Sequence, residues 1–238
     1  MRVLEIWRYP VKSLQGEQLD RVDLAAAGLD GDRRYALFDV DTGFGLTARR
    51  EPGLLFASAT AKPDGPPTIT LPDGSEASDD DALSDWLGRR VELRCTDDQD
   101  VRRYENLSDF ENEPTSPWEP FDGASGAFHD TEGATVTLLS TSTIGDWDRR
   151  RFRPNLLLDG SGEDDLVGSR VRSGAAVLAV NAPIERCVMT TRAQPDGIGR
   201  DLDVLRTIHR QRGGRLAVGA VVATPGQVRV GDELVGQE

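Results

Sequence analysis

The sequence contains only two cysteines, Cys95 and Cys187, among 238 residues. Two thiols are too few for a disulfide framework, a four-cysteine zinc site or an iron–sulfur cluster held by cysteines alone. Any electrons that the protein uses must therefore come from outside the chain. A chain of this length with 37% apolar residues is expected to fold around an ordinary hydrophobic core.

Positive charge is also in short supply. The chain has 28 basic and 41 acidic residues, a formal net charge of -13 and a pI near 4.7. Nucleic acids and anionic membranes would repel such a protein, so a general binder of either surface is excluded. Lys12 and Lys62 are the only lysines, and all other basic residues are arginines.

Long apolar runs and several familiar motifs are missing as well. No run approaches the length of a membrane span. The chain starts directly with a strand-like segment, without the charged and apolar regions of a signal peptide. We therefore expect a cytoplasmic protein without membrane contact. The sequence shows no internal repeat, dinucleotide-binding fingerprint, phosphate-binding Walker loop or H-E-x-x-H motif.

Short strands dominate what is present. The patterns predict strands at residues 3–7, 19–24, 33–40, 46–49, 54–61, 68–71 and 91–94, with a hairpin turn at 41–43. Because side chains alternate along a strand, Arg33 and Arg34 are expected on opposite faces. The closing strands are broken at Pro225 and Gly231, as a small closed barrel requires.

Helical signals are few. Residues 79–87 have apolar side chains at helical spacing, and Gly88 is suited to end that helix. Residues 140–143 resemble the N-terminal cap of a short helix over 144–150, and 203–212 form a third helical stretch. The sequence thus predicts a mainly β (α+β) fold with a few short helices.

Residues 97–130 are acidic, contain prolines and lack periodicity. We interpret this segment as a long loop, which serves either as a flap over a site or as a crossing between domains. It separates an N-terminal domain, residues 1–96, from a C-terminal domain, residues 97–238.

Cys187 follows an apolar strand-like run at 175–180 and precedes a turn at 195–197. Two interpretations are open: a buried cysteine that fills space, or a thiolate that nearby positive charge such as Arg186 makes available. Cys95 fits the first interpretation.

Three other segments offer groups that bind anions. Lys12 and Ser13 supply a charge and a hydroxyl beyond the first strand, unless the lysine is simply solvated in a turn. Pro154 favours an extended Arg153, which would place Arg153 and Asn155 on one side. An arginine fork and a carboxamide can bind a phosphate and the edge of a flat heterocycle, although a strand flank that faces water would look the same.

An ordered set of motifs resembles a known family. The chain contains Y-P-V-K-S-L, G-D-R-R-Y, T-A-R, F-H-D, R-F-R-P-N, E-R-C-V-M-T-T with P-D-G, and P-G-Q-V-R-V-G-D. In this order they resemble proteins with an N-terminal β-barrel domain packed on a molybdenum cofactor sulfurase C-terminal (MOSC) domain, itself a β-barrel. The most similar functional relatives are the molybdenum enzymes that reduce amidoximes and other N-hydroxylated compounds.

The resemblance implies a cofactor and the residues that hold it. Cys187 matches the protein ligand to molybdenum, a role that suits a soft thiolate. The cofactor, a molybdenum-bearing molybdopterin (a pyranopterin), would be held by the matching residues Lys12, Ser13, Arg33, Ser142, Thr143, Arg153 and Asn155. The motifs of Thr47, Arg49 and Asp130 also match, without an implied role.

The implied reaction is oxygen-atom transfer from a small N-hydroxylated substrate. Some bacterial relatives carry a C-terminal ferredoxin-like domain, and this chain lacks the cysteines for one. A separate electron donor of ferredoxin, flavin or cytochrome type is therefore expected. Two alternatives remain open: a carrier that holds a persulfide or the cofactor on Cys187 without turnover, and a barrel scaffold that has lost its metal.

Overall fold

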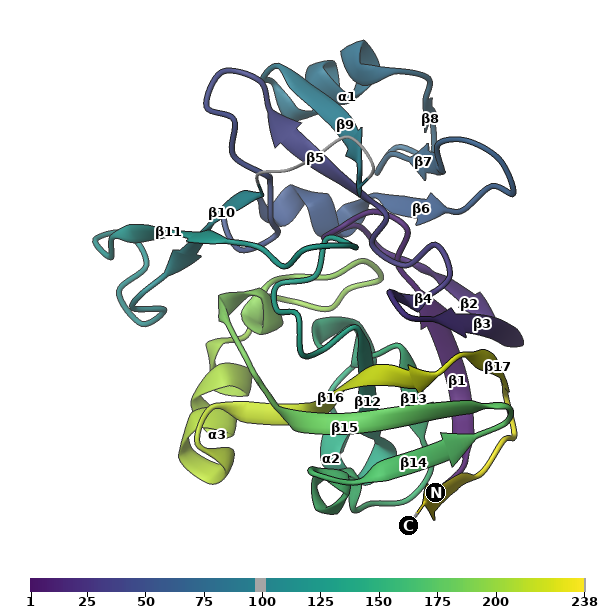
Figure 1. Ribbon diagram of the computed structural model, residues 1–238. Helices are drawn as coiled ribbons and strands as arrows, with labels where there is room; N and C mark the ends of the chain where they lie inside the picture. The colour runs from purple at the N-terminus through teal and green to yellow at the C-terminus, as the bar shows by residue number, and fades with distance from the viewer. Residues whose placement is uncertain (97–101, 238) are drawn as a thin grey trace.

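The computed structural model describes residues 1–96 and 102–237, and it confirms a mainly β fold with a few short helices (Figure 1). The predicted boundary between residues 96 and 97 falls on a segment, 97–101, that lies outside the described residues. The lower part of the view holds one large sheet, and the upper part holds smaller sheets and the helix α1.

The large sheet has eight strands in the order β18-β14-β15-β16-β12-β13-β1-β2. Both ends of the chain contribute to it, because β1 pairs antiparallel with β13, and Ile6 lies opposite Leu156. Its strands are β1 (Val3–Arg8), β2 (Glu17–Leu19), β12 (Val136–Ser140), β13 (Leu156–Leu158), β14 (Arg170–Ser173), β15 (Ala176–Glu185), β16 (Arg215–Thr224) and β18 (Leu234–Gln237).

A three-stranded sheet completes the lower half. β17 (Gly226–Arg229) pairs with β3 (Arg21–Ala25), which pairs with β4 (Gly28–Leu29). The predicted breaks at Pro225 and Gly231 lie between the closing strands. Aliphatic side chains of both sheets form one core, so the N-terminal strands and the C-terminal half are held together by buried apolar area. Its fully buried members include Val3, Ile6, Leu138, Leu156, Leu178 and Val218.

The upper half has its own core, which α1 covers. Its strands are β5 (Tyr35–Asp39), β6 (Ser58–Thr60), β7 (Thr68–Thr70), β8 (Glu76–Ala77) and β9 (Val91–Cys95), with a 3-10 turn at η1 (Pro52–Phe56). The helix α1 (Asp80–Leu87) confirms the prediction. Asp79 accepts a hydrogen bond from the Ala82 N–H at 2.9 Å, and Gly88 ends the helix with a φ of 64°.

Where the chain turns toward the lower half, the strand predicted at 33–40 forms but starts two residues later, and the strand predicted at 46–49 does not form. Arg33 does not open β5 but lies in the preceding turn, with a φ of 49° and its N–H bonded to the Tyr9 carbonyl at 2.7 Å. Residues 46–49 end in a turn because the Ser13 hydroxyl accepts the Ala48 N–H at 3.0 Å. These long-range contacts outweigh the local strand pattern.

The acidic segment is not a plain loop. Beyond residue 101 it forms a hairpin of β10 (Arg103–Leu107) and β11 (Trp118–Asp122), which we call the acidic hairpin. Only Tyr104 and Leu107 of these strands are buried, so the sequence shows too little alternation to predict them. Figure 1 shows the acidic hairpin extending sideways between the two halves.

The helices of the C-terminal half are short. They are α2 (Thr141–Ile144), η3 (Arg149–Arg151), η4 (Glu163–Leu166), η5 (Val188–Thr191) and α3 (Leu202–Arg212). The predicted helix over 144–150 is wrong, because Gly145 ends α2 and Asp148 caps a separate turn. The α3 prediction is confirmed, with Asp201 as its N-cap and Gly213 at a φ of 60°.

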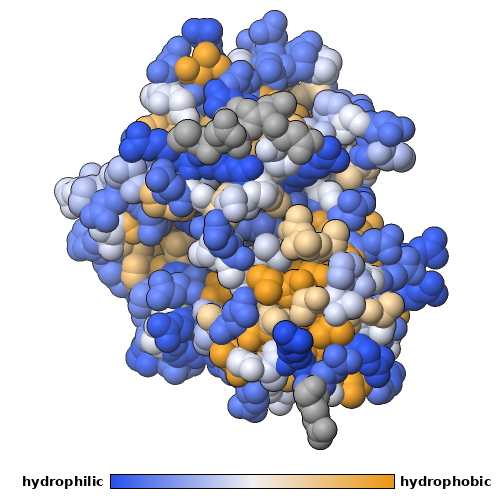
Figure 2. Space-filling model, in the orientation of Figure 1, coloured by the Kyte–Doolittle hydropathy of each residue, from blue (hydrophilic) through white to orange (hydrophobic). Residues whose placement is uncertain are grey.

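The surface is largely polar. Figure 2 shows charged and polar residues over most of one face, with an apolar area in the lower half of the view. Within residues 1–96 and 102–237, no helix is both long enough and apolar enough to span a membrane.

Asn155 joins three strands of the large sheet. Its Oδ1 accepts from the Thr137 N–H at 3.1 Å and from the Thr137 hydroxyl at 2.9 Å, and its Nδ2 donates to the Trp7 carbonyl at 3.1 Å. The side chain is fully buried. We therefore expect Asn155→Ala to lower the free energy of unfolding by about 2–4 kcal/mol, because it leaves several buried polar groups without partners.

Urea unfolding of the metal-free chain measures this loss. Asn181→Ala is the matched control, since Asn181 is exposed and donates one bond, to the Gly133 carbonyl at 3.1 Å. Equal losses in the two variants would contradict a cross-linking role for Asn155.

Candidate functional site

Cys187 lies two residues beyond the end of the long strand β15. The Arg186 N–H donates to the Gly214 carbonyl at 2.9 Å, which fixes the strand end against the start of β16. The Cys187 carbonyl accepts from the N–H and the hydroxyl of Thr190, at 3.1 and 3.0 Å. The backbone on both sides is thus held, and the half-buried thiol has a defined position.

Arg49 contacts the sulfur directly. Its Nε donates to Cys187 Sγ at 3.3 Å, and its guanidinium forms an ion pair with Asp130. Burial alone would lower the pKa of Arg49, but the charges of Asp130 and Cys187 raise it above its usual value. Arg49 therefore stays charged beside the thiol.

Lys12 and Asp130 form the next layer. The Lys12 ammonium donates to the Phe128 carbonyl at 2.9 Å and pairs with the Asp130 carboxylate. Burial lowers the pKa of Lys12, and Asp130 opposes that effect. Burial would raise the pKa of Asp130, but Arg49 and Lys12 hold it far below its ordinary value. One carboxylate thus pairs with two cations, and a net positive charge remains.

Tyr9 supports two further arginines. The Arg33 guanidinium lies 5.0 Å and that of Arg153 4.1 Å from the centre of its ring. The Tyr9 hydroxyl donates to the Pro154 carbonyl at 3.2 Å, and the Tyr9 N–H donates to the buried Asp32 at 2.7 Å. Asp32 also pairs with Arg33. This platform fixes both arginines relative to β1.

Arg153 has a backbone that the sequence did not predict. Its φ is 51°, in the left-handed region, although an extended conformation was expected before Pro154. The expected extended backbone, which would have placed Arg153 and Asn155 on one side, is therefore wrong. Within the described part of the chain, neither terminal nitrogen of the buried Arg153 guanidinium has a hydrogen-bond partner.

Burial in this environment lowers the pKa of Arg153 to about 10, and the nearby Arg33 acts in the same direction. Arg186 is similar: its Nε donates to the Leu216 carbonyl at 2.7 Å, yet one terminal nitrogen is buried without a partner among the described residues. Burial lowers its pKa to about 10 as well.

The sequence reasoning missed His129. The imidazole is buried, and its Nε2 has no hydrogen-bond partner in the part of the chain that the structure describes. Burial, with Arg33 and Lys12 nearby, lowers its pKa to about 3, against the opposing effect of Asp32 and Asp130. The position of this residue inside the F-H-D motif was the only available signal.

Three predicted binding residues share an unusual backbone. Ser13, Arg33 and Arg153 have φ angles of 70°, 49° and 51°. Among the described residues only two other non-glycine residues have a positive φ, Asp196 and Ala217. Such conformations persist where the surrounding structure enforces them, and they are concentrated at functional sites.

Two family models match the chain. The MOSC N-terminal beta barrel domain matches residues 1–110, and the MOSC domain matches residues 127–235. The chain belongs to the MOSC family. The resemblance of the motifs is thereby confirmed. No curated protein matches this MOSC chain.

Solved structures that resemble this MOSC protein are distant. The YUAD protein from Bacillus subtilis is 11% identical with a TM-score of 0.44, covering 98% of this chain and 93% of its own. YiiM from Geobacillus stearothermophilus is 18% identical with a TM-score of 0.37, covering 50% and 67%. YiiM from Escherichia coli is 20% identical with a TM-score of 0.34, covering 49% and 60%.

Not every residue that the MOSC resemblance implied lies in this cluster. Asp130 and Arg49 connect Lys12 to Cys187, and Tyr9 connects Arg33 to Arg153. Ser13 holds the turn that carries Arg49. The amide of Asn155 is occupied by Trp7 and Thr137. Ser142 is exposed at α2, and the Thr143 hydroxyl accepts from Ser140 at 3.1 Å, beside Glu163. Figure 1 shows α2 at the opposite end of the sheet from the acidic hairpin.

The cluster fits the cofactor that the MOSC fold suggests. Buried, unpaired N–H groups on Arg153 and Arg186 are suited to an anion with several acceptor oxygens. A half-buried thiol beside a cationic donor is suited to a soft metal ion. Among residues 1–96 and 102–237, no group of three His, Cys, Asp or Glu side chains forms a conventional metal site. The protein alone would therefore supply one soft ligand and a cationic cradle.

The neutral His129 predicts a pH dependence of folding. Burial lowers the pKa of His129 to about 3, whereas the unfolded chain takes up a proton near 6.5. The unfolded state binds more protons between these values, so stability is fully present above 6.5 and falls as the pH falls toward 3. We expect His129→Gln to lose less stability than the wild type between about pH 7 and about pH 5.

Urea unfolding at both pH values tests this prediction. His209→Gln is the control, because His209 is the only other histidine and is exposed on α3. It should keep the pH dependence of the wild type. A loss in His129→Gln as steep as in the wild type would contradict a buried, neutral imidazole.

Proposed function

We propose that this MOSC protein is a molybdenum-cofactor-dependent oxidoreductase that reduces small N-hydroxylated compounds. The observation that carries the proposal is a set of unpaired, buried N–H donors on Arg153 and on Arg186, the residue that precedes Cys187. Burying cations without partners costs free energy, so such groups are explained best by an anionic ligand that completes them. The MOSC family includes enzymes that use this cofactor, which supports the assignment.

The roles of the residues follow from their contacts. Cys187 would be the protein ligand to the metal, with Arg49 as a cationic hydrogen-bond donor to its sulfur. Arg153, Arg33 and Lys12 would hold the anionic part of the cofactor. Ser13 and Asp130 would act through Arg49 and Lys12, by fixing the turn and by neutralising charge. In this proposal Asn155 contributes by bracing β13. Ser142 and Thr143 would contact the cofactor from α2, at the end of β12 and outside the cluster around Cys187.

The overall reaction consumes two electrons and two protons. The N–O bond of an N-hydroxylated substrate breaks, the nitrogen keeps a proton in place of the hydroxyl group, and the oxygen leaves as water. The bound cofactor would supply two-electron oxygen-atom transfer, which no side chain of this protein can perform. The protein would bind and orient the cofactor through the cationic groups of Lys12, Arg33 and Arg153.

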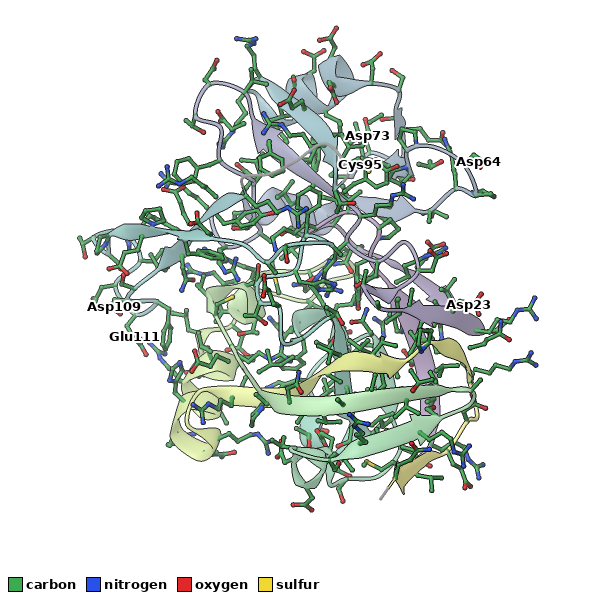
Figure 3. The ribbon with its side chains drawn as sticks, viewed as in Figure 1. Asp23, Asp64, Asp73, Cys95, Asp109 and Glu111 are labelled. Carbon is green, nitrogen blue, oxygen red and sulfur yellow. The ribbon has the colours of Figure 1, made fainter. Side chains whose placement is uncertain are left out.

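The electrons would come from a separate protein. Two cysteines cannot hold an iron–sulfur cluster of their own, and Cys95 lies in the upper half of the molecule, on β9 (Figure 3). We propose a donor of ferredoxin, flavin or cytochrome type, acting in the cytoplasm. The net charge of -13 disfavours nucleic acid as a partner.

The proposal predicts metal content. The chain produced in a host that makes the molybdenum cofactor should contain close to one molybdenum and one pterin per chain. Cys187→Ser should lose most of the molybdenum, whereas Cys95→Ser should keep it. Elemental analysis and pterin fluorescence after acid release provide the measurement. A wild-type chain without molybdenum from a competent host would overturn the proposal.

Turnover is the second step of the same test. The loaded chain with an artificial electron donor should reduce benzamidoxime or an N-hydroxylated base to the corresponding amidine or base. If it carries molybdenum and reduces none of these compounds, the cofactor assignment stands and the substrate class falls.

Replacing Arg153 is expected to stabilise the metal-free chain and to weaken its binding of the cofactor. Its guanidinium is buried over Tyr9 with unpaired terminal nitrogens. We expect Arg153→Met to raise the free energy of unfolding of the metal-free chain by about 1–3 kcal/mol, because an apolar side chain replaces an uncompensated charge. The same variant should bind several-fold less pterin when produced in the competent host.

Arg151→Met is the matched control. Arg151 is equally buried, but it donates to the carbonyls of Thr190, Arg192 and Gly199 at 3.1, 3.0 and 2.8 Å. Its replacement should cost about 2 kcal/mol or more, because the carbonyls lose their donors. If Arg153→Met destabilises the chain as much as Arg151→Met, Arg153 is a structural residue.

A second candidate is a sulfur carrier in which Cys187 holds a persulfide. The half-buried thiol and the Arg49 donor would suit that role as well. It would leave the unpaired nitrogens of Arg153 and Arg186 without a purpose. Mass spectrometry of the metal-free chain after incubation with a cysteine desulfurase distinguishes the two: a carrier gains one sulfur atom at Cys187 and passes it to an acceptor.

A further inference from the structure

The tip of the acidic hairpin is docked on η5 and α3. Phe110 stacks on His209 with 5.3 Å between ring centres, and Glu111 accepts from Arg206 Nε at 2.9 Å. Glu113 accepts from Arg192 at 2.9 Å and from Arg200 at 2.8 Å. Figure 3 shows Asp109 and Glu111 at the outer end of the hairpin, near α3.

The two acidic contacts differ in burial. Glu111 and Arg206 are 41% and 44% exposed, so water screens their ion pair and its contribution is small. Arg192 is only 6% exposed, and Glu113 is 22% exposed. Both terminal nitrogens of Arg192 reach the Glu113 carboxylate, in the two-pronged geometry that arginine favours. Glu113 is therefore the main anchor of the tip.

Arg192 also connects the tip to the site. One of its terminal nitrogens donates to the backbone carbonyl of Arg49 as well as to Glu113. The side chain of Arg49 in turn donates to Cys187 Sγ at 3.3 Å. The hairpin meets the same arginine a second time, because the Phe121 ring on β11 lies 5.3 Å from the Arg49 guanidinium.

We propose that Glu113 is a positioning residue for Cys187: docked on Arg192, it holds the turn that presents Arg49 to the sulfur. The acidic hairpin is thus part of the site, although its carboxylates do not touch Cys187. When Glu113 releases Arg192, the Arg49 carbonyl loses a charged donor and the guanidinium is no longer fixed against the thiol.

The reactivity of Cys187 reports this contact without any cofactor. The chain is produced in a host that cannot make the molybdenum cofactor, in a Cys95→Ser background, and the rate of Cys187 alkylation by iodoacetamide is followed by mass spectrometry. A chain that never binds molybdenum still gives the full comparison, so failure of the proposed function and failure of this proposal are distinguishable.

The expected result is a double-mutant cycle in which the effect of Glu113→Gln on the alkylation rate depends on Arg49. Arg49→Gln should slow alkylation by roughly tenfold, the equivalent of one charge-assisted hydrogen bond. Glu113→Gln should slow it by roughly threefold when Arg49 is present and leave it unchanged in the Arg49→Gln background. Glu111→Gln, the matched control on the same tip, should react like the parent chain. Arg192→Lys should slow alkylation as well, because lysine keeps the charge but lacks the fork.

Three outcomes would overturn the proposal. Glu113→Gln speeds up alkylation, as expected if the hairpin only shields the thiol. Glu113→Gln has the same effect with and without Arg49, as expected from a general loss of structure. Glu113→Gln and Glu111→Gln change the rate equally, as expected if any charge on the tip suffices. Circular dichroism checks whether each variant is folded. If Glu113→Gln does not fold, Arg192→Lys gives an independent test.

Discussion

The neutralisation of buried positive charge is the constraint on which the site depends. The protein carries a net charge of -13, yet it buries cationic side chains around Cys187. Asp130 pairs with Lys12 and Arg49, and Asp32 pairs with Arg33. Uncompensated charge in a protein interior is costly, so an anionic ligand would satisfy the N–H groups that have no partner on the protein. Within an acidic protein these residues form a local concentration of positive charge.

The backbone is distorted to bring these charges together. Ser13, Arg33 and Arg153 all adopt left-handed φ angles, each at a cost of about 1 kcal/mol or more. Tyr9 supports two of these segments, since its carbonyl accepts from the Arg33 N–H and its hydroxyl donates to the Pro154 carbonyl. The large sheet supplies the rigidity that this requires, because β1, β12 and β13 are joined by the buried amide of Asn155. The resemblance implied that Asn155 binds the cofactor, but its contacts equally explain it as a residue that holds together the strands next to the binding residues.

The sequence predicted the parts that depend on local chemistry. The helix α1 follows from its apolar spacing, with Asp79 at one end and Gly88 at the other, and the motifs led to the MOSC family. Two of the errors occur where distant contacts decide the conformation: the turn at Arg49 is fixed by Ser13, and Arg153 turns left-handed over Tyr9. His129 and Glu113 could not be found from the sequence. Their importance comes from neighbours more than 70 residues away, such as Arg33 and Arg192.

Arg49 is where these constraints meet. Asp130 holds its guanidinium from the inside, and Glu113 holds its backbone from the outside through Arg192. The contact with Asp130 is an ion pair of the Arg49 side chain. The contact with Arg192 is made by the Arg49 backbone carbonyl and does not use the charge of the side chain. A ligand that competes for the Arg49 guanidinium would therefore act against Asp130 and Cys187 while the turn itself stays fixed by the hairpin. The segment that the sequence presented as a featureless acidic loop thereby determines how freely the arginine next to the thiol can move.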